Sequence, residues 1–282
     1  MTVAVSESGR AARKRRSARP VDALNRGSGI ALGVALTWFS LLVLIPLAAV
    51  VAQAAAGGWD GVTNVLSNAQ NVHAIEITVR QALLVTGLNI VMGTAIAWVL
   101  VRDRFPGAAI LDVVIDIPFA LPTIVTGLVL VTLYGPNSPL NLDVANSQKA
   151  VFLAMAFVTL PFVVRTVQPV LEELEADVEE AASSLGASRF TTFRRVILPS
   201  LVPAIAAGAA LSFARGIGEY GSMVLLTGNL PGQTEVVSVR VISYIEGGNT
   251  AAASVLATVM LLIALVVIVG FDLVQRRVAR RD

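Results

Sequence analysis

The chain has 282 residues, of which 55% are hydrophobic and 14% charged, and its formal net charge is +2. Such an apolar composition, gathered into long blocks, excludes an ordinary soluble domain of this length. The sequence has no cysteine and one histidine, His73, and therefore offers no thiol nucleophile and no cluster with metal-ligand spacing. It also lacks a G-x-x-x-x-G-K-[ST] loop, so we expect the chain to bind no ATP itself.

The first 28 residues are polar and rich in serine and arginine, which predicts a disordered basic tail. The basic run at 13–16 is of a kind that binds nucleic acid, but next to a membrane span it more often marks the cytoplasmic side, so we expect no nucleic acid partner. The first apolar block follows at 29–53. It is longer than the ~7–15 residues of a signal-peptide core and is predicted to be a retained transmembrane helix.

Five more apolar blocks follow, and with the first they predict an all-α polytopic membrane protein with six transmembrane helices. These blocks are residues 77–101, 110–133, 150–171, 201–226 and 251–274. Together they make a permease-sized domain over 29–275, followed by a basic tail at 276–282. Arginines gather in both tails, in the 102–109 connection and in 172–199, whereas the other loops hold only Lys149 and Arg240. Because cytoplasmic loops carry the excess of basic residues, both termini are predicted to be cytoplasmic.

Prolines and glycines interrupt several blocks. Pro118 and Pro122 are predicted to kink the third span, because each removes a helical hydrogen bond. Glycines at 216, 218 and 221 flank Glu219-Tyr220 in the fifth block. They allow either close helix packing or bending of a helix that lines a pore, and the sequence leaves both interpretations open. The stretch 228–250 is predicted to be an external loop.

Six charged residues lie within the blocks or at their ends. An arginine or aspartate at the centre of a span costs ~2.5–3.5 kcal/mol on insertion scales, so these side chains should face other helices, water or each other. They either help an anion to pass or hold a gate, or they form ion pairs that fix the bundle. Two pairs, Asp112 with Asp116 and Arg215 with Glu219, are spaced by four residues and therefore share a helix face. The six residues are Arg80, Asp112, Asp116, Arg165, Arg215 and Glu219.

The charged segment 172–199 lies between the fourth and fifth blocks and must lie in water. Its residues 177–185 favour a helix, and Gly186 is a natural stop for that helix. A second short helix over 189–196 is predicted with Ser188 as its N-cap, and Pro199 suits the first turn of the next span. The segment is thus a helix, a glycine turn and a second helix, unless it is only a solvated amphipathic loop.

This segment resembles the EAA loop of ATP-binding-cassette (ABC) import permeases. The motif reads Glu180-Ala181-Ala182, three residues, Gly186, nine residues, Val196, one residue and Leu198-Pro199, with valine where the family usually has isoleucine. The resemblance implies the type I permease fold and a coupling helix that docks on a cytoplasmic ATPase dimer. We expect the coupling residues to be Glu180, Ala181, Ala182, Leu185, Gly186, Phe190, Phe193, Leu198 and Pro199.

Further stretches narrow the resemblance. Residues 213–222, 228–231 and 234–236, together with 119–123 and 133–135, resemble the T-subunit family of the sulfate and thiosulfate importers. Molybdate permeases carry related segments, typically with phenylalanine near the Tyr220 position, so molybdate, tungstate or another oxyanion remains an alternative. The candidates for the translocation path are Arg215, Glu219, Tyr220, Ser222, Pro122 and Thr123.

The resemblance implies a complex in the inner or plasma membrane. Its other parts are a second, related permease subunit, ATPases that carry ATP and Mg, an external sulfate-binding protein and membrane lipid. This chain is expected to bind no cofactor and no metal and to have no catalytic residue. A stand-alone secondary anion transporter is the rival interpretation, which the EAA loop opposes. A membrane enzyme is a second rival, but one histidine without cysteine leaves little for an active site.

Overall fold

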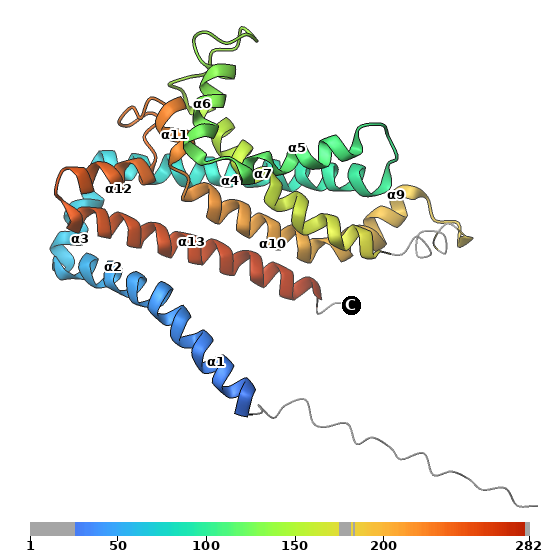
Figure 1. Ribbon diagram of the computed structural model, residues 1–282, viewed down its shortest axis with the longest axis horizontal. Helices are drawn as coiled ribbons and strands as arrows, with labels where there is room; N and C mark the ends of the chain where they lie inside the picture. The colour runs from blue at the N-terminus through green and yellow to red at the C-terminus, as the bar shows by residue number, and fades with distance from the viewer. Residues whose placement is uncertain (1–25, 175–181, 183, 280–282) are drawn as a thin grey trace, which may run out of the picture. The chain divides into compact units, whose positions relative to one another are not determined.

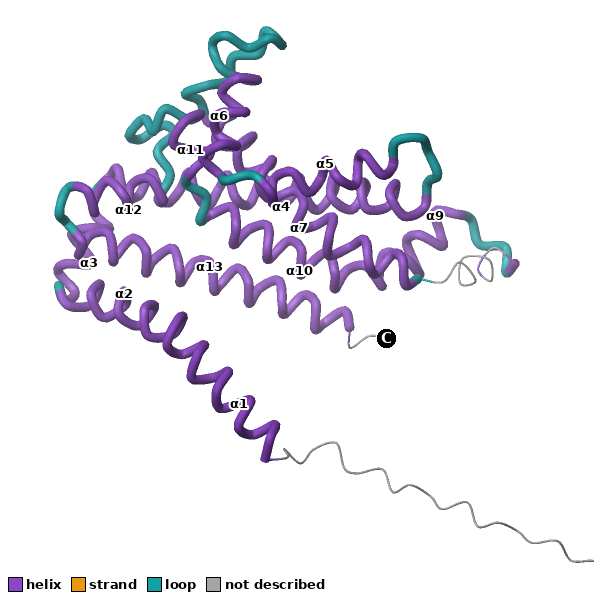
Figure 2. The backbone as a smooth tube through the Cα atoms, in the orientation of Figure 1, coloured by secondary structure: helices purple, strands orange, loops and turns teal. Residues whose placement is uncertain are grey.

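The computed structural model describes residues 26–174, 182 and 184–279, and every regular element among them is a helix. Figures 1 and 2 show their order. The chain divides into two units, residues 1–48 and 49–282. The helices are α1 Arg26–Phe39, the π-helical η1 Ser40–Leu44, α2 Ile45–Ala56, α3 Gly58–Ser67, α4 Ala69–Arg102, α5 Ala108–Ala120, α6 Thr123–Tyr134, α7 Gln148–Glu173, α9 Arg189–Thr192, the π-helical η2 Phe193–Ile197, α10 Leu198–Ile217, α11 Gly221–Leu226, α12 Val237–Glu246 and α13 Thr250–Ala279.

Among the described residues, five helical segments are long and apolar enough to cross a membrane, and α5 with α6 makes a sixth if the two are counted as one span. The all-α polytopic prediction is therefore confirmed. The five segments are Gly27–Ala56, Ala69–Arg102, Gln148–Glu173, Arg189–Ile217 and Thr250–Arg277.

The third predicted span is not one kinked helix but two. Helices α5 and α6 meet at an angle of 118°. The break falls at Leu121, whose φ of −86° and ψ of 133° are extended. A residue before proline is pushed out of the helical region by the proline ring, so Pro122 ends α5, while Pro118 stays inside it. The two prolines therefore act differently, and the second one breaks the block.

The fifth predicted span is displaced toward the N-terminus. Helical structure runs without a break from Arg189 to Ile217, and the last residues of the predicted block form the separate short helix α11.

The two π-helical turns each precede a proline: η2 ends two residues before Pro199, and η1 ends two residues before Pro46. Proline has no N–H and its ring crowds the carbonyl four residues back, and a widened π turn relieves that contact.

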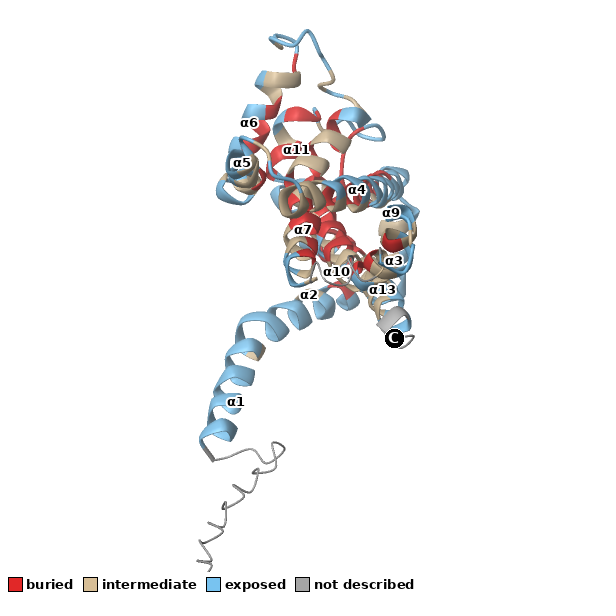
Figure 3. Ribbon diagram, turned by 90° about the vertical axis from the view of Figure 1, so that its right-hand side faces the viewer, coloured by how far each residue is buried: buried red, intermediate tan, exposed pale blue. Residues whose placement is uncertain are grey.

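The core of residues 49–282 lies where α4, α7 and α10 pack together, and Figure 3 shows the buried residues concentrated there. Phe213, Met155 and Leu201 are among its fully buried side chains. A polar contact also joins the three helices, because Asn89 Nδ2 donates to Thr159 Oγ1 at 2.8 Å and to Ser212 Oγ at 3.0 Å. Helix α13 packs along α10 and thereby joins this core.

The predicted loop at 228–250 contains a helix, α12. Its first N–H, of Val237, donates to Thr78 Oγ1 of α4 at 2.9 Å. Its Arg240 Nε and Tyr244 hydroxyl both donate to the buried Asn71 Oδ1, at 3.0 and 3.1 Å. The turn residues at both ends of this stretch suggested a loop, and side-chain contacts with α4 hold the intervening residues as a helix.

Candidate functional site

The glycine turn of the predicted coupling segment is present. Gly186 has a φ of +82°, and the Ala187 N–H donates to the Ala182 carbonyl at 3.0 Å. This six-to-one hydrogen bond across a left-handed glycine is the Schellman arrangement that ends helices. The predicted stop at Gly186 is therefore confirmed. Glu180, Ala181 and most of the helix predicted at 177–185 lie outside the described residues.

The helix after the turn begins where the sequence predicts. Ser188 Oγ accepts from the Thr191 N–H at 3.2 Å and caps α9. The helical path then continues through η2, and Pro199 lies in the first turn of α10. A single continuous helix of 29 residues, Arg189–Ile217, thus joins the coupling segment to the middle of the bundle.

The predicted coupling residues differ in their exposure. Leu185 and Phe190 are 89% and 70% exposed, which is unusual for large apolar side chains in a polar segment. The ring of Phe193 instead packs edge-on against Trp98 of α4, with centroids 5.5 Å apart. Leu198 and Pro199 are half-buried at the start of α10. Phe193 is therefore a contact within this chain, and Leu185 and Phe190 are the apolar groups presented outward.

A second candidate site lies at the break between α10 and α11. Glu219 is fully buried, and its Oε2 lies 2.7 Å from Arg215 Nη2. Its Oε1 accepts from the Ser222 N–H at 3.0 Å and from Ser222 Oγ at 2.9 Å. Ser238 of α12 donates to the Glu219 carbonyl at 2.5 Å. The break is thus held by one carboxylate, one guanidinium and two serines.

The break between α5 and α6 packs on this second break. A Cβ placed on Gly221 would lie 2.7 Å from the backbone nitrogen of Ile124 and would overlap Thr123 Oγ1. Gly221 therefore permits close packing of α11 on α6. Gly218 has an ordinary φ of −92° and no neighbour closer than 3.8 Å, so it lies at the bend without being needed for packing. The packing interpretation thus holds at Gly221, and the bending of a pore-lining helix at Gly218 stays a prediction.

Most of the predicted translocation-path residues come together here. Arg215, Glu219 and Ser222 contact one another, Thr123 lies against Gly221, and Pro122 precedes Thr123 as the N-cap residue of α6. Tyr220 is exposed and lines a cavity of about 340 Å³ with residues from the end of α10 and from α12 and α13. That these residues line the path of an anion stays a prediction.

The aspartates of α5 form ion pairs with α7. Arg165 Nη1 lies 2.6 Å from Asp112 Oδ1, and Arg165 Nε donates to Asp116 Oδ1 at 2.8 Å. Arg165 Nη1 also donates to Gln168 Oε1 at 2.7 Å. For these three charges the interpretation as bundle-fixing ion pairs therefore fits the geometry. The spacing of the aspartates indicated their shared face, but no sequence signal named Arg165 as their partner.

One buried acid was not singled out from the sequence. Glu235 lies before α12, and burial raises the pKa of its carboxyl, while the nearby Arg240 lowers it to a smaller extent. The two groups are 3.7 Å apart. A cluster of Glu235, Arg240, Tyr244 and Asn71 therefore holds α12 on the start of α4. Asn71 lies more than 160 positions before the other three members, which is why no motif revealed the cluster.

The comparisons with known proteins decide the family. The model of the family described as "Binding-protein-dependent transport system inner membrane component" matches residues 89–281, most of the described helices. The chain belongs to this family. The permease is thus a subunit of a membrane transport system, of the ABC importer type, and is not an enzyme.

Curated relatives of the permease cover nearly its whole length. It is 41% identical over 262 residues to the "Sulfate transport system permease protein CysT" of Salmonella typhimurium, which covers 90% of this chain and 95% of the relative. The protein of the same name from Synechocystis is 42% identical over 250 residues, covering 86% and 87%.

Solved structures share the fold at low identity. A chain of a bacterial alginate ABC transporter, solved in complex with its alginate-bound periplasmic protein, has a TM-score of 0.74 at 16% identity and covers 89% of the permease and 94% of that chain. A chain of the MetNI methionine ABC transporter in an inward-facing conformation has a TM-score of 0.57 at 17% identity, covering 73% and 95%.

Proposed function

We propose that this permease carries sulfate or thiosulfate into the cell as part of an ATP-driven importer. The observation that carries the proposal is the 41% identity to sulfate permeases over 90% of the chain. In this proposal both termini and the coupling segment are cytoplasmic, and the start of α7 and the 228–250 stretch face outward. The distribution of arginines supports that orientation.

The coupling segment receives the movement of the ATPase. Leu185 and Phe190 are the apolar groups available for an interface, and buried aromatic anchors dominate small interfaces. Phe193 fixes the same segment to α4 through Trp98. The 29-residue helix from Arg189 to Ile217 is ~44 Å long at 1.5 Å per residue. A displacement at α9 is thereby carried to the break at Gly218, because a helix moves as a rigid rod.

The break between α10 and α11 offers a cation, Arg215, that can bind the anion, and a carboxylate, Glu219, that competes with the anion for it. The Arg215 side chain is 33% exposed, whereas its partner Glu219 is fully buried. An incoming oxyanion and the Glu219 carboxylate compete for the same guanidinium, which forms charge-assisted hydrogen bonds with either. Ser222 and Ser238 keep Glu219 in place during that exchange. The expected partners are a second, related permease subunit, an ATPase dimer with ATP and Mg, and an external anion-binding protein.

Uptake by the purified complex in proteoliposomes tests the proposal. Radiolabelled sulfate should accumulate only when the ATPase, ATP and the external binding protein are present, and unlabelled thiosulfate should compete. Accumulation without the ATPase would identify a secondary transporter. Competition by molybdate or tungstate, with no effect of thiosulfate, would assign another oxyanion.

A further inference from the structure

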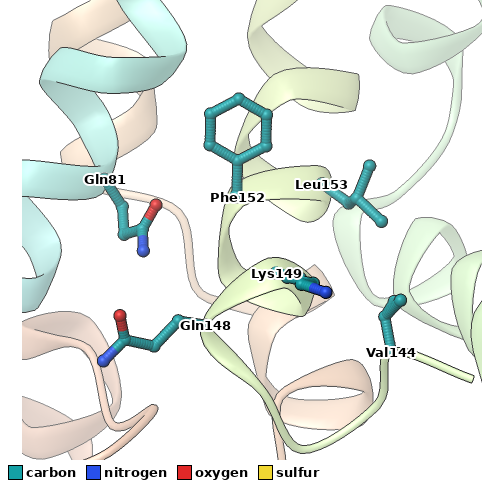
Figure 4. Close-up of a pocket in the computed structure, with 6 residues that line it drawn as sticks. All are labelled: Gln81, Val144, Gln148, Lys149, Phe152 and Leu153. Atoms are coloured by element: carbon teal, nitrogen blue, oxygen red, sulfur yellow. The ribbon is translucent and has the colours of Figure 1, made fainter.

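Helix α4 borders a hollow near each of its ends. The hollow near its start has a volume of about 430 Å³ and is lined by Gln81, Val144, Gln148, Lys149, Phe152 and Leu153. Figure 4 shows that the Lys149 ammonium points away from the Gln81 and Gln148 amides, so these polar groups do not converge on a ligand. The hollow near the end of α4 has a volume of about 490 Å³ and is lined by six residues between Ile90 and Val99 and by Phe193, Leu198 and Ile205. We call this second hollow the Trp98 groove, after the aromatic residue in it.

The Trp98 groove is apolar and has the length of one membrane leaflet. All of its lining residues are uncharged, and Val91 and Ala95 are exposed, so the groove opens away from the bundle. Ile90 and Val99 are nine residues apart, which is a rise of ~14 Å in an α-helix, and the hydrocarbon of one leaflet is ~15 Å thick, half of the ~30 Å core. Both helical paths that line the groove belong to segments that can cross a membrane. The groove therefore fits one acyl chain that lies along the spans.

Positive charge gathers at one end of the Trp98 groove. The two helical paths meet at this end, because the Phe193 ring packs against Trp98. Arg102 follows Trp98 by four residues, and its guanidinium lies 6.0 Å from the centre of the Trp98 ring. Arg194 and Arg195 directly follow Phe193 and precede another lining residue by four and three positions. Because residues at these spacings are neighbours on a helix surface, three guanidinium groups lie at the same end of the groove.

Arg194 and Arg195 are available to a ligand. Both are exposed and, within the described part of the chain, form no ion pair or hydrogen bond. The stretches 90–104 and 189–205 together hold five arginines and a single acidic residue, Asp103. This end of the groove therefore attracts a phosphate, and clusters of basic residues beside spans bind anionic headgroups.

We propose that the Trp98 groove binds one anionic phospholipid, with an acyl chain along α4 and the phosphate on Arg194 and Arg195. The order of groups along the groove carries the proposal, because apolar residues, an aromatic ring and arginines match the chain, the interface and the headgroup of a phospholipid. The proposal rests on the proposed function for the cytoplasmic leaflet, but not for the binding itself. Since the chain lies against both Trp98 and Phe193, the bound lipid strengthens the attachment of the coupling segment to α4.

Fluorescence quenching tests the proposal, because Trp98 lies in the groove. The full transporter complex is placed in phosphatidylcholine nanodiscs with a small fraction of phosphatidylglycerol or phosphatidylcholine whose acyl chains are brominated, since bromine quenches indole fluorescence at short range. The Trp98 signal is the difference between complexes that carry Trp98 and complexes that carry Trp98→Phe. Each arginine near an anionic headgroup contributes about a fivefold preference, so brominated phosphatidylglycerol should bind beside Trp98 about 25-fold more strongly than brominated phosphatidylcholine. Equal quenching by the two lipids would overturn the proposal.

Two kinds of variant test the headgroup and the chain separately. Arg194→Gln and Arg195→Gln should each lower the preference about fivefold, and the double variant should bind the two lipids equally. Arg277→Gln, which removes an exposed arginine near the C-terminus, is the matched control and should keep the preference. Ala95→Phe fills the groove and should reduce the quenching by phosphatidylglycerol to the level of phosphatidylcholine, whereas Val266→Phe, at a position of α13 that is 71% exposed, should not. A preference that survives in the double variant or in Ala95→Phe would contradict the site.

A protein that occupies the Trp98 groove would give a different result. If neither brominated lipid quenches Trp98 in the full complex, another subunit covers the groove and the proposal is wrong. Because no transport is measured, failure of this test is distinct from failure of sulfate uptake.

Discussion

Replacing Arg215 by glutamine should lower the folding stability of the permease, because it breaks the ion pair with Glu219. Arg215 Nη2 lies 2.7 Å from a Glu219 carboxylate that is fully buried. Among the described residues, removing the cation leaves that carboxylate with the two Ser222 hydrogen bonds alone. Breaking a buried ion pair by deleting one partner costs about 3–5 kcal/mol. Because the Arg215 side chain is 33% exposed and Ser222 remains, we expect about 2–3 kcal/mol.

The expected loss is asymmetric between the two partners. Glu219→Gln keeps an acceptor for Ser222, and it leaves an arginine that already reaches solvent, so its cost should be about 1 kcal/mol or less. The double variant Arg215→Gln, Glu219→Gln should recover most of the stability lost in Arg215→Gln, because no buried charge remains unpaired.

Thermal unfolding of the purified permease in detergent measures these differences. At ~2–4 °C per kcal/mol for a chain of this size, Arg215→Gln should lower the midpoint by about 4–12 °C. Assembly with the partner subunits should fall in parallel. If Arg215→Gln unfolds at the wild-type temperature, or if the double variant is no better than the single one, the ion pair does not hold the break. Normal stability with lost uptake would place Arg215 in transport alone.

Three other changes test other parts of the structure. Gly186→Val forces a β-branched residue to a φ of +82° at a cost of about 1–2 kcal/mol, and it should abolish ATPase recruitment or anion-stimulated hydrolysis while the spans stay intact. The control is Gly270→Val, at a helical glycine that also has open space around it. Normal coupling in Gly186→Val would refute the coupling-loop assignment. Arg165→Met should cost about 1–2 kcal/mol by unfolding in detergent, since its two aspartates are half exposed, and neutralising both aspartates should restore stability. Because burial raises the folded pKa of Glu235, the contribution of this carboxyl to stability should be fully present below its unfolded pKa near 4.5 and should be lost as the pH rises through the folded pKa. Glu235→Gln should flatten this part of the stability–pH profile, and an unaltered profile would contradict the assignment.

The apolar blocks and the glycine turn could be predicted because each depends on local chemistry. A run of some 20 apolar residues has no soluble alternative, and the left-handed conformation at Gly186 follows from the residue itself. The break at Leu121 follows from Pro122 by the same local reasoning, but a kink and a break look alike in sequence. The displacement of the fifth span was not predicted, because residues 189–200 include several polar residues and a hydropathy profile does not count them as part of a span, although they are helical.

The contacts that assemble the candidate sites depend on tertiary structure and left no local signal. Phe193 looks like Phe190 in the sequence, yet it packs on Trp98, which lies 95 positions earlier. Helix α12 is stabilised by contacts with Asn71 and Thr78 of α4. These contacts are not visible in the sequence, where the turn residues on both sides of the helix suggested a loop. The pairing of Arg165 with the aspartates of α5 belongs to the same class.

The π turn before Pro199 decides which way the coupling segment faces. Residues 190 and 201 are 11 apart in one unbroken helical path. In a regular α-helix at 3.6 residues per turn, such positions point within about 20° of each other. Leu201 is fully buried, so Phe190 would then project toward the same interior. The π turn takes up one additional residue and offsets the two stretches by roughly 100°. The steric effect of a single proline thus sets the direction in which the Phe190 side chain points around the helix axis, which is away from the bundle.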